Sequence, residues 1–281
     1  MKFKITHNTV YLFNSEVFLE PHYLRFRPRQ TAYVDVTDYS ITILSEPVGH
    51  KVIQDEENNM VDFCWFEGMT KQLTITSTSI LETKAFNPFD FLIYPLHFNQ
   101  LPLQYDELQK KLLFSTLEGQ LISQELIEYG TAILKASEFN TIAFLTNLTK
   151  QLHDDFSVEY REVGSPLQPD ETFTIKRGSC RDLSWMQINL LRQFGIAARF
   201  VSGYYYFDMI HPAYELHAWV EVFLPGIGWL GLDPSHGIFT GNTHFPIASS
   251  AHFENTMPVS GGIRGSATSK LITQLSIEKY K

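Results

Sequence analysis

The sequence predicts an α+β fold, with an antiparallel β-sandwich first and helices packed on an antiparallel sheet second. Two observations predict it. Up to about residue 83, apolar and polar residues alternate, as Phe3 and Ile5 do with Lys4 and Thr6, and this is the period of a half-buried strand. After residue 123, apolar residues recur at helical spacing, and strand-like runs follow from residue 198. Strands followed by a mixed segment are typical of an α+β protein.

The first part is expected to hold five to seven short strands and no helix, because turn signals such as Pro47-Val48-Gly49 separate the alternating runs. A stretch of little periodicity follows, interrupted by Pro88, Pro95 and Pro102, and is typical of a connector. We therefore expect a β-sandwich domain over residues 1–105 and a second domain, with helices packed on an antiparallel sheet, over residues 106–281.

Three helices are expected in the second domain. Ser123 is expected to cap a helix that runs to Leu134, and another helix is expected from about Thr141 to His153. The third begins at residue 180 and ends before Gly195, which suits the position just after a helix. The region from 234 to 258 is expected to be rich in loops, and a closing strand is expected over 270–277.

The composition excludes several classes of protein. The chain has 281 residues, 44% of them hydrophobic and 19% charged, which is typical of a globular protein. Its net charge of -9, without a dense block of Lys and Arg, argues against a nucleic-acid partner. No stretch approaches the roughly 20 apolar residues of a membrane span, and no signal peptide is expected. We therefore expect a cytoplasmic chain without membrane contact; its oligomeric state stays open.

The chain has only two cysteines, Cys64 and Cys180, too few and too far apart for a disulfide scaffold or a paired-cysteine zinc site. Cys64 lies within an expected strand and is interpreted as structural. Cys180 follows Ser179, a suitable N-cap, and so stands in the first turn of a helix. Free backbone N–H groups and the helix dipole favour an anion there, and the thiolate is the nucleophilic form of cysteine. A small buried thiol remains the alternative from this stretch alone.

A histidine and an aspartate favour the nucleophile. His217 opens one expected strand, a turn at Gly226–Gly228 reverses the chain, and Asp233 closes the returning strand. This geometry can pair the His217 ring with the Asp233 carboxylate across neighbouring strands. Cys180 would then attack, His217 would take and return the proton, and Asp233 would orient His217. Taken singly, His217 could be an ordinary strand-edge histidine and Asp233 an ordinary turn residue.

These residues resemble the core of the transglutaminase-like superfamily. The similar segments are Gly178-x-Cys180-x-Asp182, the helix end running from Leu190 to Arg199, Val201-Ser202-Gly203-Tyr204, the strand from His217 to Val222, and Gly228-Trp229-x-Gly231-x-Asp233-Pro234. The preceding β domain resembles the N-terminal region of the bacterial branch. The resemblance implies a papain-like core and a Cys–His–Asp triad, matched here by Cys180, His217 and Asp233.

We therefore expect a cysteine-dependent peptidase or amidase that acts on a peptide or amide substrate through a thioester at Cys180, with water as acceptor and no cofactor. A cross-linking transglutaminase would need a channel for an amine, and only short connections lie between Cys180 and Asp233. That enzyme, and a catalytically silent binding module on the same fold, stay open as alternatives. No metal site is expected, because the crowded histidines of the C-terminal loops lack helical His-x-x-x-His spacing. These are His211, His236, His244 and His252.

Overall fold

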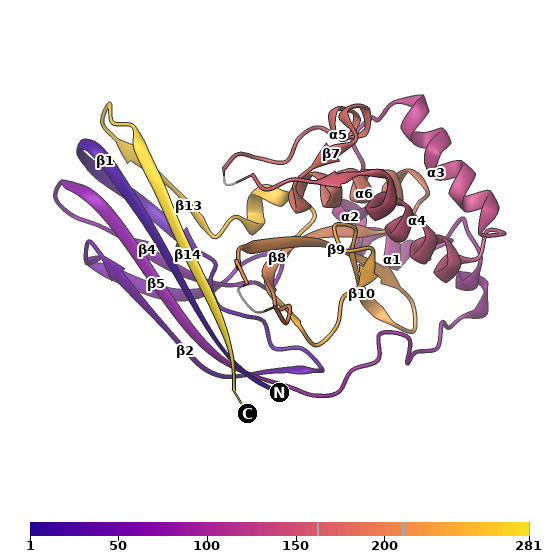
Figure 1. Cartoon of the computed structure of the whole chain (residues 1–281), viewed down its shortest axis with the longest axis horizontal. Helices are drawn as coiled ribbons and strands as arrows, with labels where there is room; N and C mark the ends of the chain where they lie inside the picture. Colours follow the sequence, from indigo (N-terminus) through magenta and orange to yellow (C-terminus); the bar gives the residue numbers. More distant parts are fainter. Residues whose placement is uncertain (162, 210–211, 281) are drawn as a thin grey trace.

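The computed structural model describes residues 1–161, 163–209 and 212–280, and it confirms the α+β class. Figure 1 shows strands alone in one half of the molecule and helices around a second sheet in the other half. Among the helices of the described residues, none is long and apolar enough to cross a membrane.

The N-terminal half is built on one long strand, β1, which spans Lys2–Leu24 and so is longer than the short strands expected. Residues 2–12 of β1 pair with β5, whereas residues 22–24 pair with β4. The strand thus passes from one layer of the sandwich into the other. The remaining strands of this half are β2 (Val34–Leu44), β3 (Gly49–Gln54), β4 (Met60–Trp65) and β5 (Thr70–Thr83). Apolar side chains fill the space between the layers, among them Leu19, Phe26 and Ile75.

Two strands of this sandwich come from the end of the described chain. β14 (Ser269–Tyr280) runs antiparallel to β1 over residues 2–13, and β13 (Val259–Arg264) pairs with residues 18–24 of β1. The expected boundary near residue 105 assigned residues 259–280 to the second domain. The structure places them in the N-terminal sandwich instead, because β1 needs a second neighbour to satisfy its other edge.

The helices and the second sheet form the half of the molecule that carries Cys180, His217 and Asp233, and this half is called the catalytic half below. Its antiparallel sheet has five strands in the order β11-β10-β9-β8-β12. The expected helices are present as α3 (Gln124–Ala136), α4 (Thr141–Asp155) and α6 (Cys180–Gln193), and Ser123 caps α3 as expected. The strands are β8 (Ala198–Tyr205), β9 (Leu216–Leu224), β10 (Gly228–Asp233), β11 (Ile238–Phe239) and β12 (His244–Ser250).

Several short elements lie in stretches that were expected to be irregular. β12 belongs to the region expected to be rich in loops, and it is buried throughout. The others are η1 (Leu96–Asn99), α1 (Glu107–Leu112), α2 (Phe114–Leu117), α5 (Pro169–Ile175), β7 (Arg177–Gly178) and η2 (Phe253–Thr256). β6 (Ser157–Val158) pairs with β7 in a small parallel sheet.

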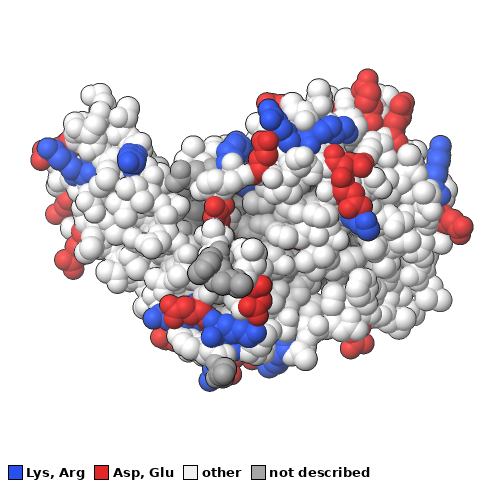
Figure 2. Space-filling view, viewed as in Figure 1, with Lys and Arg blue, Asp and Glu red and all other residues white. Residues whose placement is uncertain are grey.

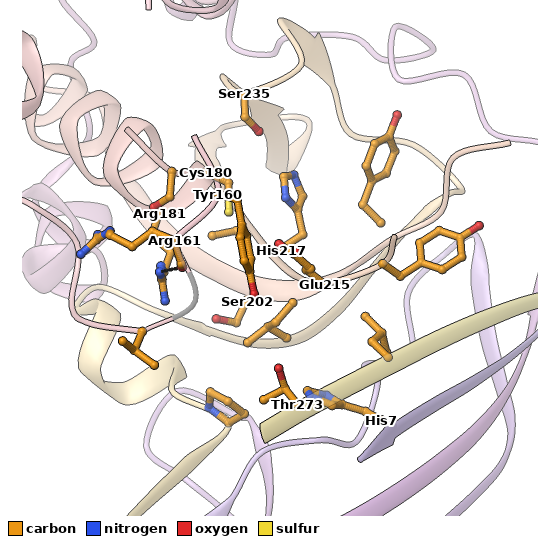
Figure 3. A pocket seen from close by; sticks show the side chains of 18 of the residues that line it. His7, Tyr160, Arg161, Cys180, Arg181, Ser202, Glu215, His217, Ser235 and Thr273 are labelled. Atoms are coloured by element: carbon orange, nitrogen blue, oxygen red, sulfur yellow. Dashed lines mark hydrogen bonds between the residues drawn. The ribbon is translucent and has the colours of Figure 1, made fainter. Parts of the chain in front are cut away.

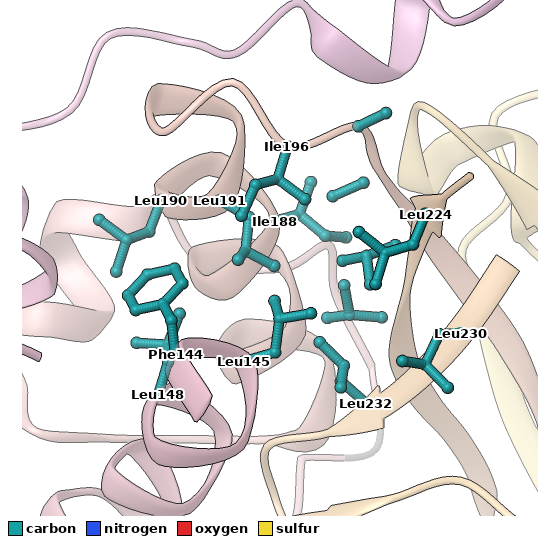
Figure 4. Close-up of a cluster of buried hydrophobic side chains, with 14 of the residues drawn as sticks. Phe144, Leu145, Leu148, Ile188, Leu190, Leu191, Ile196, Leu224, Leu230 and Leu232 are labelled. Atoms are coloured by element: carbon teal, nitrogen blue, oxygen red, sulfur yellow. The ribbon is translucent and has the colours of Figure 1, made fainter. Parts of the chain in front are cut away.

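Helix α6 lies at the centre of the catalytic half. Its apolar residues, including Ile188 and Leu191, pack between α4 and the sheet (Figure 4). Leu145 and Leu148 meet them from α4, and Leu232 meets them from β10. Because nearly the whole helix is buried, its first residue, Cys180, is held in a fixed place relative to the sheet.

The two halves share a third apolar cluster. Phe3, Ile5 and Ile277 of the sandwich pack against Tyr204 and Phe245 of the catalytic sheet. This contact fixes one end of β1 and β14 against the catalytic half.

Candidate active site

Asp182 fixes the start of α6 and therefore the position of Cys180. Its carboxylate is fully buried and accepts hydrogen bonds from the Ser179 backbone N–H at 2.7 Å and the Ser179 hydroxyl at 2.8 Å. It also accepts from the Leu167 backbone N–H at 2.7 Å and pairs with the guanidinium of Arg161. An acidic residue in the first turn of a helix satisfies N–H groups that the helix itself leaves free. Asp182 thus ties the loop before α6 to the first turn.

Gly178 is required by this close packing. A Cβ atom at position 178 would lie 2.8 Å from the Cβ of Asp182, which is closer than carbon atoms approach. Two residues further on, Cys180 is the first residue of α6 and is partly exposed. Its thiol therefore lies at the surface end of an otherwise buried helix.

Helix α6 is docked on the strand that carries the histidine. The Ser184 hydroxyl donates to the backbone carbonyl of Ala218 at 3.2 Å, one residue after His217. This contact places Cys180 one helical turn from β9, and Cys180 lies close enough to His217 to raise the pKa of its ring. The structure thus brings together two residues that lie far apart in the sequence.

His217 and Asp233 pair across the hairpin as expected. β9 and β10 are antiparallel with Leu232 opposite Val220, so the start of β9 meets the end of β10. The Nε2 atom of His217 lies 2.7 Å from Oδ2 of Asp233. Since the carboxylate engages Nε2, the other ring nitrogen, Nδ1, is left for Cys180. In such an arrangement the carboxylate orients the base, and the base acts on the nucleophile.

The charges of the three groups reinforce one another. Burial acts to lower the pKa of His217, but attraction to Asp233 and to Cys180 outweighs burial and raises this pKa to about 10. Burial likewise acts to raise the pKa of Asp233, but attraction to His217 and hydrogen bonds from three histidines hold it well below its usual value. The site therefore favours an imidazolium ring next to a carboxylate at neutral pH.

Asp233 is surrounded by more donors than the sequence indicated. Its Oδ2 atom also lies 2.9 Å from Nδ1 of His236 and 3.3 Å from Nε2 of His244. Its Oδ1 atom accepts from the Ser235 backbone N–H at 3.0 Å and the Ser235 hydroxyl at 2.6 Å. His236 and His244 thus hold the carboxylate that orients His217. The sequence identified both as histidines of the C-terminal loops but gave no signal for this contact.

The cluster around Asp233 contains residue types that can bind a metal ion. The possible ligand atoms of His217, Asp233 and His236 lie within 4.8 Å of one another. A metal ion there would have to displace the direct bonds from both rings to Oδ2 of Asp233. The donor set therefore fits a hydrogen-bonded carboxylate better than an ion. Of the other histidines considered, His252 directly precedes η2 and is not part of the cluster, and His211 lies outside the described residues.

Tyr205 packs against the histidine cluster. Its ring stacks on His244 with centroids 4.3 Å apart and meets the edge of His236 at 4.6 Å. Its neighbour Tyr204 is fully buried and belongs to the contact between the two halves. Tyr205 thus belongs to the site, whereas Tyr204 fills the core.

Cys180 and His217 open into a cavity of about 610 Å³. The catalytic half forms one wall, and β1 and β14 of the sandwich form the opposite wall. Figure 3 shows His7 and Thr273 on that opposite wall, across from Cys180 and His217. In Figure 2 the surface is hollowed between the sandwich and the catalytic half. The sandwich is thus part of the site.

Two segments of the chain match the sequence models of known families. Residues 133–234 match the sequence model of the transglutaminase-like superfamily, and residues 3–82 match that of the bacterial transglutaminase-like N-terminal region. An uncharacterized protein of Mycobacterium tuberculosis (strain ATCC 25618 / H37Rv) is 22% identical over 292 residues, covering 96% of this chain and 90% of that protein. A protein-glutamine gamma-glutamyltransferase of Pseudomonas aeruginosa is 34% identical over 77 residues, covering 25% of this chain and 11% of that protein.

A solved structure has the same fold. The crystal structure of a candidate cysteine protease from Cytophaga hutchinsonii superposes with a TM-score of 0.72 at 18% identity, over 100% of this chain and 92% of that chain. The likeness covers the sandwich as well as the catalytic half. The chain therefore belongs to the transglutaminase-like superfamily, a family of cysteine-dependent enzymes, and carries the bacterial transglutaminase-like N-terminal region.

Proposed function

We propose that this protein is a peptidase or amidase that works through a thioester at Cys180. The observation that carries the proposal is the chain of contacts from Cys180 to His217 and from His217 to Asp233 at the opening of a cavity. A cysteine nucleophile needs a base within hydrogen-bond reach, and the base needs a group that fixes its orientation.

In the first step, Sγ of Cys180 attacks the carbonyl carbon of the amide. The oxyanion that develops faces the first turn of α6, where the Cys180 backbone N–H has no partner within the helix. The imidazolium of His217 then gives its proton to the leaving nitrogen, so that the C–N bond breaks and a thioester remains.

In the second step, His217, now neutral, takes a proton from water as the water oxygen attacks the thioester. The C–S bond breaks, a carboxylic acid leaves and Cys180 recovers its starting form. Asp233 stays ionised throughout and stabilises the imidazolium each time it forms. The pKa of about 10 for His217 describes the resting pair with Cys180, and acylation removes the part of this shift that comes from Cys180.

Water is the acceptor that we propose, because the connections between Cys180 and Asp233 are short and hydrolysis needs only an open path. An amine acceptor would need a second channel that shields the thioester. A competition assay tests this point: an acyl-donor peptide is supplied with a primary amine at millimolar concentration, and the product ratio is measured as the amine is diluted. Hydrolysed product is expected to dominate, whereas amine-coupled product that persists on dilution would assign the enzyme to cross-linking.

Trapping of the thioester tests the chemistry itself. Peptides and isopeptides are screened with rapid acid quenching, and the intact protein is weighed by mass spectrometry. An adduct is expected on the wild-type chain and not on Cys180→Ala. A folded wild-type chain that forms no adduct with any donor and does not alkylate at Cys180 would favour a binding module on the same fold.

A further inference from the structure

β14 has one edge that no strand of the described chain occupies. It pairs with β1 along its whole length, and no other strand in the described ranges pairs with it. The contact recorded on the other side is a single antiparallel bridge between Leu275 and Tyr214. This bridge shows that the edge accepts a main-chain partner. Between residues 269 and 274 no described residue pairs with this edge, which can therefore take an added strand.

The open edge borders the cavity of the active site. Leu271, Thr273, Gln274 and Leu275 all line the cavity that Cys180 and His217 open into. Successive residues of a strand point to opposite faces, so Thr273 and Gln274 could not both line a cavity that lay against one face alone. The cavity therefore meets the edge of β14 as well as its inner face.

The inner face next to this edge is uncharged. The ladder between the two strands sets Thr273 opposite Thr9 and Leu271 opposite Tyr11. These four residues all line the cavity. A wall of hydroxyl and apolar groups suits neutral side chains and gives no counter-charge to an ionised one.

We propose that the enzyme binds its substrate as an extended polypeptide segment that adds a strand to the open edge of β14. This inference rests on the proposed function, since it names the substrate class of the same site. In such binding, main-chain hydrogen bonds give the affinity and alternate side chains give the selectivity. Residues 269–274 offer about 17 Å of strand, and a cavity of about 610 Å³ is of the size that holds a short peptide.

The open edge of β14 restricts which segments can bind as a substrate. An added strand needs a segment whose own main-chain groups are free, so helices and paired strands are excluded. The favoured segment is unfolded or a flexible loop, with neutral residues such as Val, Thr or Ser near the scissile amide. Small amides would reach Cys180 but would forgo the contacts with β14.

The first test measures binding without turnover, using Cys180→Ala and a fluorescent ten-residue peptide with a central glutamine flanked by Val, Thr and Ser. Two further versions of the peptide carry N-methyl groups on its odd or on its even backbone amides. Along one edge of a strand, alternate N–H groups point to the partner. We expect one version to bind about tenfold more weakly, because two or more main-chain hydrogen bonds are lost, and the other to bind almost as well as the parent. Equal affinity, or equal loss, for the two versions would overturn the inference.

The second test changes β14 itself in the Cys180→Ala chain. Thr273→Arg places a large charged side chain on the cavity wall, whereas Ile272→Arg places the same side chain on the opposite, exposed face of the strand. We expect Thr273→Arg to weaken peptide binding about tenfold and Ile272→Arg to leave it unchanged, with equal melting temperatures. Equal binding of the peptide by the two variants would overturn the inference. So would the absence of peptide binding by both the Cys180→Ala chain and its Ile272→Arg variant.

The two proposals can fail separately. If Cys180 forms a thioester with small amide donors but the peptide does not bind along β14, the chemistry stands and the substrate class is wrong. If the peptide binds with the expected dependence on the edge but no thioester forms with any donor, the docking strand stands and the peptidase proposal is wrong.

Discussion

Cys64 and Cys180 each lie beside a histidine–aspartate pair, and the two places differ in almost every other respect. Cys64 stands in β4 opposite His50, and Nε2 of His50 lies 2.9 Å from Oδ1 of Asp62. Cys64 is completely buried, and its pKa is raised to about 12, first by burial and then by the charge of Asp62.

The comparison shows how the surroundings of the two thiols differ. Cys180 stands at the free N–H groups of a helix start, lies next to a histidine of raised pKa, and opens into a cavity. Cys64 stands within a strand, one residue before its end, and its thiol donates to the backbone carbonyl of His22 at 3.7 Å. A cysteine beside a histidine and an aspartate is therefore not enough to identify a reactive thiol. The position on the element and the access to a cavity decide the role.

Removal of each thiol gives the largest expected contrast. We expect Cys180→Ala to lower kcat by more than about 10³-fold, because the nucleophile itself is lost. Cys64→Ala should leave kcat within about twofold and lower the free energy of unfolding by about 1 kcal/mol, because a buried side chain is shortened. Steady-state kinetics and urea titration of the two variants measure these effects. Comparable loss of kcat in both variants would mean that Cys64 takes part in the reaction.

Removal of each carboxylate charge gives the next contrast. Asp233→Asn is expected to lower kcat by about 10²–10⁴-fold, because the amide no longer stabilises the imidazolium of His217, and to lower the melting temperature as well, because Asp233 is buried among the same donors; the far-UV circular dichroism of the folded chain should stay unchanged. Asp62→Asn is the matched control beside the other cysteine. It should keep kcat and lower stability, since Asp62 is buried and interacts with His50, Tyr39 and Arg27. If Asp233→Asn turned over at the wild-type rate, another group would have to orient His217.

Alkylation compares the two thiols directly in the wild-type chain. Iodoacetamide at pH 7 should modify Cys180 at least about 100-fold faster than Cys64, because a thiol with a pKa of about 12 is almost never a thiolate at that pH. His217→Ala should slow the reaction of Cys180 and leave that of Cys64 unchanged. Peptide mapping by mass spectrometry reads both rates in one experiment. Equal and slow modification would contradict the assignment of Cys180 as the nucleophile.

Stability against pH gives the smallest contrast, between two buried histidines. The pKa of His217 is raised to about 10, so its contribution to stability is complete below about pH 6.5 and is lost as the pH rises toward 10. Burial lowers the pKa of His7 to about 4, so its contribution is complete above about pH 6.5 and is lost as the pH falls toward 4.

Urea titrations of His217→Ala, His7→Gln and the wild type at pH 5, 7 and 9 separate these two effects. From pH 7 to pH 5 the wild type should lose about 2 kcal/mol more than His7→Gln does. From pH 7 to pH 9 it should lose stability relative to His217→Ala. Parallel curves for a variant and the wild type would mean that the histidine in question titrates alike in the folded and unfolded chain.

The sequence was informative where partners are close along the chain. His217 and Asp233 lie on two strands joined by a tight turn, so local register sets their contact. Ser179 and Gly195 mark the two ends of α6, because caps act within a few residues. Ser123 marks the start of α3 in the same way.

The rest depends on contacts that no local pattern contains. His244 reaches Asp233 from β12, which pairs with β8 across a long stretch of chain. β14 was expected as a strand, but which strand it joins depends on the free edge of β1. The short helices α1, α2 and α5 have 6, 4 and 7 residues, and so few residues make no visible helical period.

The pairing of β1 with β14 also has a consequence for synthesis on the ribosome. Roughly 245 residues separate the end of β1 from the start of β14, which corresponds to on the order of 10–50 s of translation. During that time the side of β1 that later meets β14 has no partner from its own chain, and an unpaired strand edge is a template for pairing with other chains. Nascent chains of this fold should therefore depend on chaperones more than their finished stability suggests. The wall that faces Cys180 is the last part of the cavity to form, so Cys180 emerges before the surface that we propose to bind the substrate.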